Sequence, residues 1–175
     1  MPVKLNLDDL HQRHRALTEP LAGAYREAAA VCMNRHHDSP AEMTVIDNGT
    51  RRSAELSWPV PDARMLAAWA NEIDTTEFGA YGCVISAVEL TRGLFAIRRA
   101  ETGTGADYYV GRQGSGDDLE DCLRLEVSGL SSGPVGEVNR RLVEKVSQSL
   151  RGNSSLPALA GVVGFSAKMI MIQDV

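Results

Sequence analysis

The chain has 175 residues, of which 43% are hydrophobic and 23% charged, so it can bury a core of its own and is too apolar to be wholly disordered. Its 18 Lys and Arg against 23 Asp and Glu residues give a net charge of −5, which argues against a protein that coats nucleic acid by charge alone. Three cysteines without a CxxC motif or signal peptide predict a cytoplasmic protein, and the short apolar runs predict no membrane partner.

Residues 1–73 are expected to form a helical and hairpin extension packed on the rest of the chain. From Leu5 to about His37, apolar residues recur at helical spacing, with Pro20 interrupting the helix or starting a second one. The histidines of this arm, with Cys32, lack a second ligand group at zinc spacing, so we expect them to be solvated side chains on the helix surface.

The stretch EMTVIDNGTRRSAELSW predicts a β-hairpin over about residues 42–58. Asn48-Gly49 separates two strand-like segments, and this dipeptide is the strongest short signal for a two-residue hairpin turn. The hairpin should present Arg51 and Arg52 beside the core. A short helix over DARMLAAWANEI is expected to follow.

Residues 74–175 are expected to form the core, in one compact domain with the extension. A helix over TTEFGAYGCVISAVELTRG precedes the strands LFAIRRA, ADYYVG and CLRLEVSGL, and a helix over GEVNRRLVEKVSQSLRG precedes the strands LAGVVGF and KMIMI. The resulting order, α-β-β-β-α-β with one further strand, predicts an α/β fold class with a mixed, α+β type of sheet.

Two carboxylates stand inside consecutive predicted strands, Asp107 in ADYYVG and Glu126 in CLRLEVSGL. Strand interiors disfavour carboxylates unless these are paired, solvated or bound to a cation. If the strands are antiparallel neighbours, the two groups can meet on one face of the sheet, where a divalent cation would relieve their repulsion and activate a water. The alternative is that Glu126 pairs with Arg124 or Arg98 on a solvated face.

With these two acids in place, residues 74–168 resemble the PD-(D/E)xK nuclease superfamily, which has an α-β-β-β-α-β core of the restriction-endonuclease type. The resemblance implies that Asp107 and Glu126 hold Mg²⁺ or Mn²⁺ and that a metal-bound water hydrolyses a phosphodiester. It implies a metal-dependent nuclease, or a nuclease-derived module, of bacterial DNA defence or processing. The segments GTGADYY and RLEVSG also resemble uncharacterised bacterial proteins, which imply no function.

The alternative function is a catalytically inert subunit of the same fold. Such a subunit would bind a protein partner or nucleic acid, and a homodimer is a further option. The distinction depends on a cation, because the family's lysine normally lies two residues beyond the glutamate and this chain has Ser128 there. A serine cannot supply the positive charge that stabilises the transition state.

Lys145 is the substitute that the following helix offers. On this helix Lys145 lies beside the apolar face that should pack on the sheet, which carries Val138, Leu142 and Val146. Its ammonium could therefore reach the sheet. The alternative is a solvated lysine paired with Glu144.

Glu77 is a further candidate, which the resemblance would make the helical acid of the site. It lies on the buried stripe of its helix, but Asp74 and Glu77 also fit a capping box, and this second interpretation is favoured. Glu89, at the far edge of the same helix, is a weaker alternative ligand.

Overall fold

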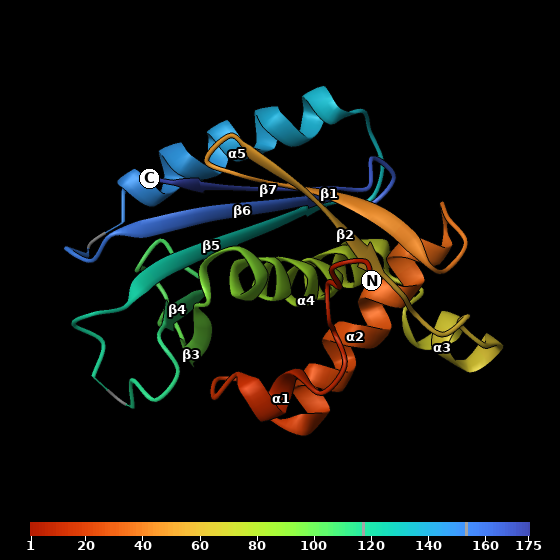
Figure 1. Ribbon diagram of the computed structural model, residues 1–175, viewed down its shortest axis with the longest axis horizontal. Helices are drawn as coiled ribbons and strands as arrows, with labels where there is room; N and C mark the ends of the chain where they lie inside the picture. The colour runs from red at the N-terminus through yellow and green to blue at the C-terminus, as the bar shows by residue number, and fades with distance from the viewer. Residues whose placement is uncertain (117, 153) are drawn as a thin grey trace.

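A single mixed β-sheet organises the chain (Figure 1). The computed structural model describes residues 1–116, 118–152 and 154–175. Within them, seven strands pair in the order β2-β1-β7-β6-β5-β4-β3. They are β1 (Ala41–Asp47), β2 (Thr50–Leu56), β3 (Phe95–Arg99), β4 (Tyr108–Gly111), β5 (Leu123–Leu130), β6 (Ala158–Gly164) and β7 (Met169–Asp174). The β1–β7 and β5–β6 pairs are parallel, and the other four pairs are antiparallel.

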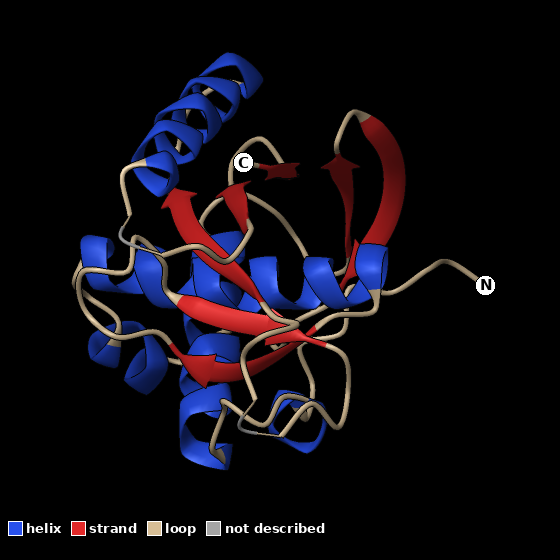
Figure 2. Cartoon of the chain, turned by 90° about the vertical axis from the view of Figure 1, so that its left-hand side faces the viewer, coloured by secondary structure: helices blue, strands red, loops and turns tan. Residues whose placement is uncertain are grey.

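Helices cover both faces of this sheet. In the described residues they are α1 (Leu10–Arg13), α2 (Glu19–Asn34), α3 (Ala63–Ala68), α4 (Glu72–Arg92) and α5 (Val135–Leu150). Helices α2 and α4 share the larger hydrophobic core on one face, whereas α5 packs on the other face (Figures 1 and 2). This architecture confirms the α+β fold class and the predicted order α-β-β-β-α-β, formed by α4, β3, β4, β5, α5 and β6.

The hairpin of residues 42–58 is confirmed, and it is part of the main sheet. Asn48 and Gly49 have φ angles of 46° and 82°, the left-handed values that a two-residue hairpin turn requires. Strand β1 then pairs in parallel with β7, which joins the N-terminal extension to the sheet. Arg51 and Arg52 are exposed on β2, an edge strand.

The N-terminal segment contacts both edge strands of the sheet. At one edge, the Leu5 amide donates to the Glu55 carbonyl of β2 at 2.9 Å. At the other, the Ala16 amide donates to the Ala96 carbonyl of β3 at 3.0 Å, and the Ala96 amide donates to Nδ1 of His14 at 3.0 Å. These bonds cover part of each edge, where unpaired backbone groups would otherwise invite association.

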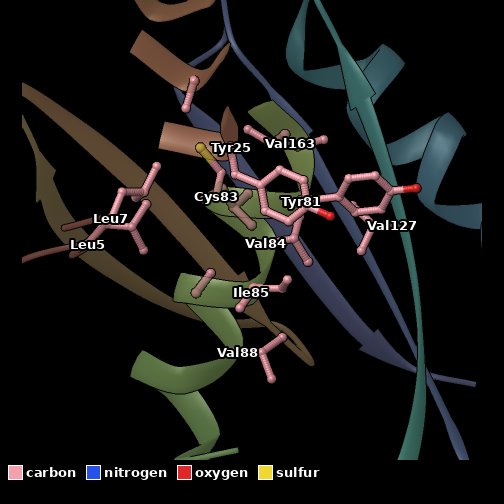
Figure 3. Packing of buried hydrophobic residues seen from close by; sticks show 14 of the residues in the cluster. Leu5, Leu7, Tyr25, Tyr81, Cys83, Val84, Ile85, Val88, Val127 and Val163 are labelled. Carbon is pink, nitrogen blue, oxygen red and sulfur yellow. The ribbon is translucent and has the colours of Figure 1, made fainter. Parts of the chain in front are cut away.

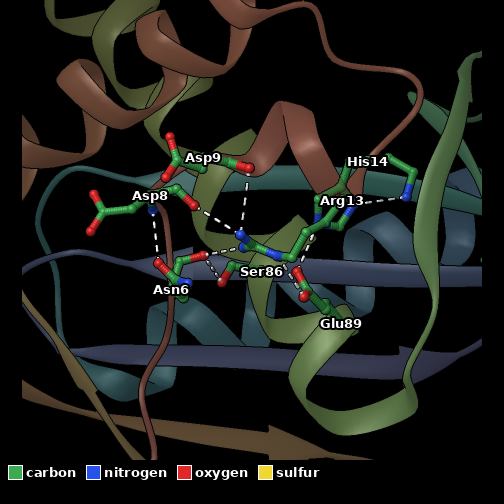
Figure 4. A network of polar contacts seen from close by, with 8 residues as sticks. Asn6, Asp8, Asp9, Arg13, His14, Ser86 and Glu89 are labelled. Carbon is green, nitrogen blue, oxygen red and sulfur yellow. Dashed lines mark hydrogen bonds and ion pairs between the residues drawn. The ribbon is translucent and has the colours of Figure 1, made fainter.

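The expectation that the histidines are solvated is wrong for His14, whose side chain is fully buried. Its Nε2 lies 2.7 Å from Oε2 of Glu89 on α4, and Arg13 donates to the other oxygen of the same carboxylate at 2.8 Å (Figure 4). Burial raises the pKa of Glu89, but these two hydrogen bonds hold it below its usual value. Helical spacing could not reveal this contact because Glu89 lies on a distant element.

Helix α4 packs closely against the centre of the sheet. Val84, Ile85 and Val88 point into the core that the helix shares with the sheet and α2 (Figure 3). Opposite Val84, strand β6 carries Gly161, where a Cβ atom would overlap Cγ1 of Val84. Because glycine has no side chain, α4 can approach β6 closely at this point. The same close approach determines the distance between the polar residues of α4 and strand β5.

Gly161→Ala should lower the free energy of unfolding by about 1–3 kcal/mol, because the added methyl overpacks this contact. Gly23→Ala is the matched control, since the structure leaves open space at that exposed position of α2. The control should stabilise the protein by about 0.5–1 kcal/mol. Urea unfolding of the two variants measures the difference, and equal stability for both would contradict the proposed close contact.

Candidate functional site

Asp107 and Glu126 lie opposite each other on neighbouring strands, as the sequence predicted. The antiparallel β4–β5 ladder ends with Tyr108 opposite Leu125, and Asp107 and Glu126 are the next residues on the two sides. Asp107 itself stands one residue before β4, and its amide still donates to the Leu125 carbonyl at 2.8 Å. Because this carbonyl belongs to Leu125 and not to Glu126, the regular register ends at Tyr108, and the two acids lie just beyond it.

The two carboxyl groups interact directly in a partly buried place. Their side chains are 19% and 15% exposed, respectively. Burial raises the pKa of Glu126, and the charge of Asp107 together with a hydrogen bond between the two carboxyl groups raises it further. Two like charges in a restricted space therefore make Glu126 harder to ionise in the folded protein than in the unfolded chain.

Lys145 of α5 reaches this pair. Its Nζ lies 3.0 Å from Oε1 of Glu126 and 2.9 Å from Oε1 of Gln148. This contact opposes the rise in the pKa of Glu126 without cancelling it. The position of Lys145 at the border of the buried stripe therefore led to the correct prediction.

The solvated alternatives for these residues are wrong. Arg124 is buried and donates to the backbone carbonyls of Thr104, Ser149 and Leu156. Arg98 pairs with Glu101 at 2.8 Å, and Glu144 lies 3.5 Å from Arg141 instead of pairing with Lys145.

Asp107 is held by groups that the sequence did not reveal. Its carboxylate accepts from the Val127 amide at 2.8 Å and from the Tyr81 hydroxyl at 3.1 Å, and Arg99 approaches it at 3.5 Å. The guanidinium of Arg99 also stacks over the Tyr81 and Tyr108 rings, 4.8 and 4.9 Å from their centroids. Tyr81 belongs to the same helix as Glu77, and only the fold brings its hydroxyl to Asp107.

Glu77 belongs to the same site, and the capping-box interpretation is wrong. Helix α4 begins three residues earlier than expected, and the side chain of Asn71 accepts from the Asp74 amide at 3.1 Å as the N-cap. Oε1 of Glu77 instead lies 3.0 Å from the Tyr81 hydroxyl, whose single proton Glu77 and Asp107 share as acceptors. The i, i+4 spacing of Glu77 and Tyr81 was the available signal. Glu89 lies with His14 and Arg13, and we found no contact between it and the site residues.

A cleft of about 680 Å³ joins these side chains. Its walls come from α4, β5 and α5. The lining residues are Glu72, Ile73, Thr76, Glu77, Ala80, Tyr81, Asp107, Glu126, Val127, Ser128, Gly129, Leu130, Ser131, Arg141 and Lys145.

The donor set of the cleft suits a hard divalent cation. Carboxylate oxygens are the preferred ligands of Mg²⁺, which is commonly held by one or two carboxylates and keeps several waters. In the described part of the chain, no three His, Cys, Asp or Glu side chains converge as a complete metal site. Asp107 and Glu126, whose carboxyl groups are in contact, are the two residues that could hold such an ion.

Comparison of the chain with family models, with curated proteins and with solved structures gave no match. Among the described helices, none has the length and apolar character needed to cross a membrane.

Asp107→Ala should lower the free energy of unfolding by about 1–3 kcal/mol, because it leaves the Val127 amide and the Tyr81 hydroxyl without this acceptor. Asp107→Asn keeps an acceptor oxygen and removes the repulsion with Glu126, so it should cost much less. Thermal and urea unfolding at neutral pH compare the two variants. An alanine variant as stable as the wild type would show that these hydrogen bonds do not matter to the fold.

Glu126→Gln should become more stable relative to the wild type as pH rises. Since the folded pKa of Glu126 is raised, ionising this group is harder in the folded than in the unfolded chain, and wild-type stability falls as pH rises through the folded pKa. Glutamine removes that loss and still offers an oxygen to Lys145. The difference in Tm between the two proteins, measured from acid to neutral pH, should therefore grow.

The matched control is Glu120→Gln, at an exposed glutamate outside the cleft. Its Tm difference from the wild type should stay flat over the same pH range. A flat profile for Glu126→Gln as well would mean that Asp107 and burial do not disfavour the charge on Glu126.

Proposed function

We propose that the protein is a divalent-metal-dependent phosphodiesterase, a nuclease or nuclease-derived module of bacterial DNA defence or processing. The observation that supports this is the opposed pair Asp107 and Glu126 with the Lys145 ammonium 3.0 Å from Glu126. The element order α-β-β-β-α-β resembles the PD-(D/E)xK superfamily, and Lys145 offers the positive charge that Ser128 cannot.

In this proposal Asp107 and Glu126 hold Mg²⁺ or Mn²⁺. When bound, the cation would polarise a phosphoryl oxygen and lower the pKa of a water. The Tyr81 hydroxyl and the Val127 amide fix the orientation of the Asp107 carboxylate, which keeps it from turning away from the pair. Lys145 is the candidate catalytic cation, because its ammonium can donate to negative charge that develops beside Glu126.

A second function, the catalytically inert subunit, is favoured by one specific contact. The ammonium of Lys145 pairs with Glu126 at 3.0 Å, so this acid has a charged partner within the protein. In that case the cleft would serve a protein or nucleic-acid partner.

Under either function we propose a cytoplasmic location, which the three free and buried cysteines support. A homodimer stays a prediction.

Lys145→Ala should reduce Mn²⁺-dependent cleavage at least ~100-fold, since it removes a preorganised charge from the transition state. Its Tm should change little, because a partly exposed ion pair contributes about 0–1 kcal/mol. Lys4→Ala, at an exposed position outside the cleft, is the control and should cleave like the wild type.

The assay offers single-stranded and duplex DNA, RNA and short diesters, with Mg²⁺, Mn²⁺ or excess chelator. Metal-dependent cleavage that survives Lys145→Ala would exclude Lys145 as the catalytic cation. A wild-type protein that cleaves none of these substrates would contradict the phosphodiesterase and favour the inert subunit.

A further inference from the structure

The charges of the cleft are nearly balanced. Among the described residues, those that line it include four acids, Glu72, Glu77, Asp107 and Glu126, and two bases, Arg141 and Lys145. Arg99 reaches Asp107 from beside the cleft at 3.5 Å. Glu144 lies 3.5 Å from Arg141, so five acids face three cations around the cleft. With all five acids ionised, a bound dication would bring the sum of charges to zero, and such a cleft suits a single phosphodiester group better than a run of phosphates.

The opposite walls of the cleft differ in sign. Helix α4 contributes Glu72 and Glu77, whereas α5 contributes Arg141 and Lys145. Duplex DNA carries about one negative charge per 1.7 Å of its axis. A duplex laid across the cleft would therefore set phosphates against the acidic wall. Among the described residues that line the cleft, the cations that could accept a phosphate lie on the α5 side, and the Arg141 guanidinium points into this region to bond Oγ of Ser128 at 2.8 Å.

An apolar side chain stands at the edge of the acidic wall. Ile73 is 79% exposed and lines the cleft, and Val127 and Leu130 continue the apolar surface inside. Such a surface suits the flat face of a nucleobase or another aromatic ring. The volume of about 680 Å³ falls within the range of small-molecule sites, roughly 300–1,000 Å³.

Resting on the phosphodiesterase function proposed above, we propose that the cleft selects a short single-stranded or dinucleotide-sized phosphodiester over duplex nucleic acid. The phosphate lies on the side of Arg141 and Lys145, and a base contacts Ile73. Selection follows from the near-zero net charge of the loaded cleft and from the acidic wall, Glu72 and Glu77, that repels neighbouring phosphates.

The test measures binding in Ca²⁺ by fluorescence anisotropy, with a labelled single-stranded tetranucleotide and a labelled 20-base-pair duplex as probes. The tetranucleotide should bind at least about tenfold tighter. Its log affinity should fall with log salt concentration with a slope of about −1 to −2, because each single-strand phosphate contact contributes about −0.7. A duplex that binds tighter, or a slope of −5 or steeper, would overturn the proposal.

Two matched pairs of variants locate the binding. Arg141→Ala should weaken tetranucleotide binding at least about tenfold, whereas Arg140→Ala should change it less than twofold because Arg140 is exposed and outside the cleft. Ile73→Ser should weaken binding about fivefold or more, whereas Val60→Ser, at a residue 75% exposed and outside the cleft, should not. Equal effects within either pair would count against the proposed site.

Binding and cleavage can fail separately. The tetranucleotide could bind in Ca²⁺ with this pattern of variant effects and still not be cleaved in Mg²⁺ or Mn²⁺. That result would support the inferred ligand and contradict the proposed phosphodiesterase activity. Duplex DNA could instead be cleaved faster than single strands in a reaction that needs Lys145. That result would support the proposed phosphodiesterase activity and contradict the inferred ligand. Absence of binding for both probes would also contradict the inferred ligand.

Discussion

The opposition of Asp107 and Glu126 across the β4–β5 pair is the constraint on which the rest of the cleft depends. Two partly buried carboxyl groups in contact disfavour their own ionisation, and the raised pKa of Glu126 expresses that cost. The surrounding residues compensate from separate elements. Tyr81 and the Val127 amide hold Asp107, and Lys145 holds Glu126. An arrangement that opposes stability in this way is typical of functional sites.

The N-terminal extension keeps these elements in place. Helix α2 packs on α4, and the Tyr25 hydroxyl is hydrogen-bonded to the Tyr108 hydroxyl, next to Asp107. At the other end of α4, His14 bonds Glu89 and the backbone of β3. The position of Tyr81 is thus determined at both ends of its helix, which fixes its hydroxyl against the Asp107 carboxylate.

The features that the sequence predicted correctly depend on local rules. The hairpin follows from the backbone preferences of Asn48-Gly49. The helical period of about 3.6 residues places Lys145 near the side of its helix that packs on the sheet. The opposition of Asp107 and Glu126 needed only the assumption that consecutive strands pair. The features that were missed depend on contacts between distant segments. Neither the parallel pairing of β1 with β7 nor the burial of His14 against Glu89 leaves a periodic signal. The contacts of Arg99 and Tyr81 with Asp107 require the folded sheet.

The most direct test of the proposed site is a crystal soaked with Mn²⁺ and measured at the manganese absorption edge. If Asp107 and Glu126 form a cation site, an anomalous difference peak should lie between their carboxylates, and it should vanish in crystals of Asp107→Asn. A structure without that peak, in which Glu126 contacts only Asp107 and Lys145, would contradict metal binding and leave the inert subunit as the better description of this protein.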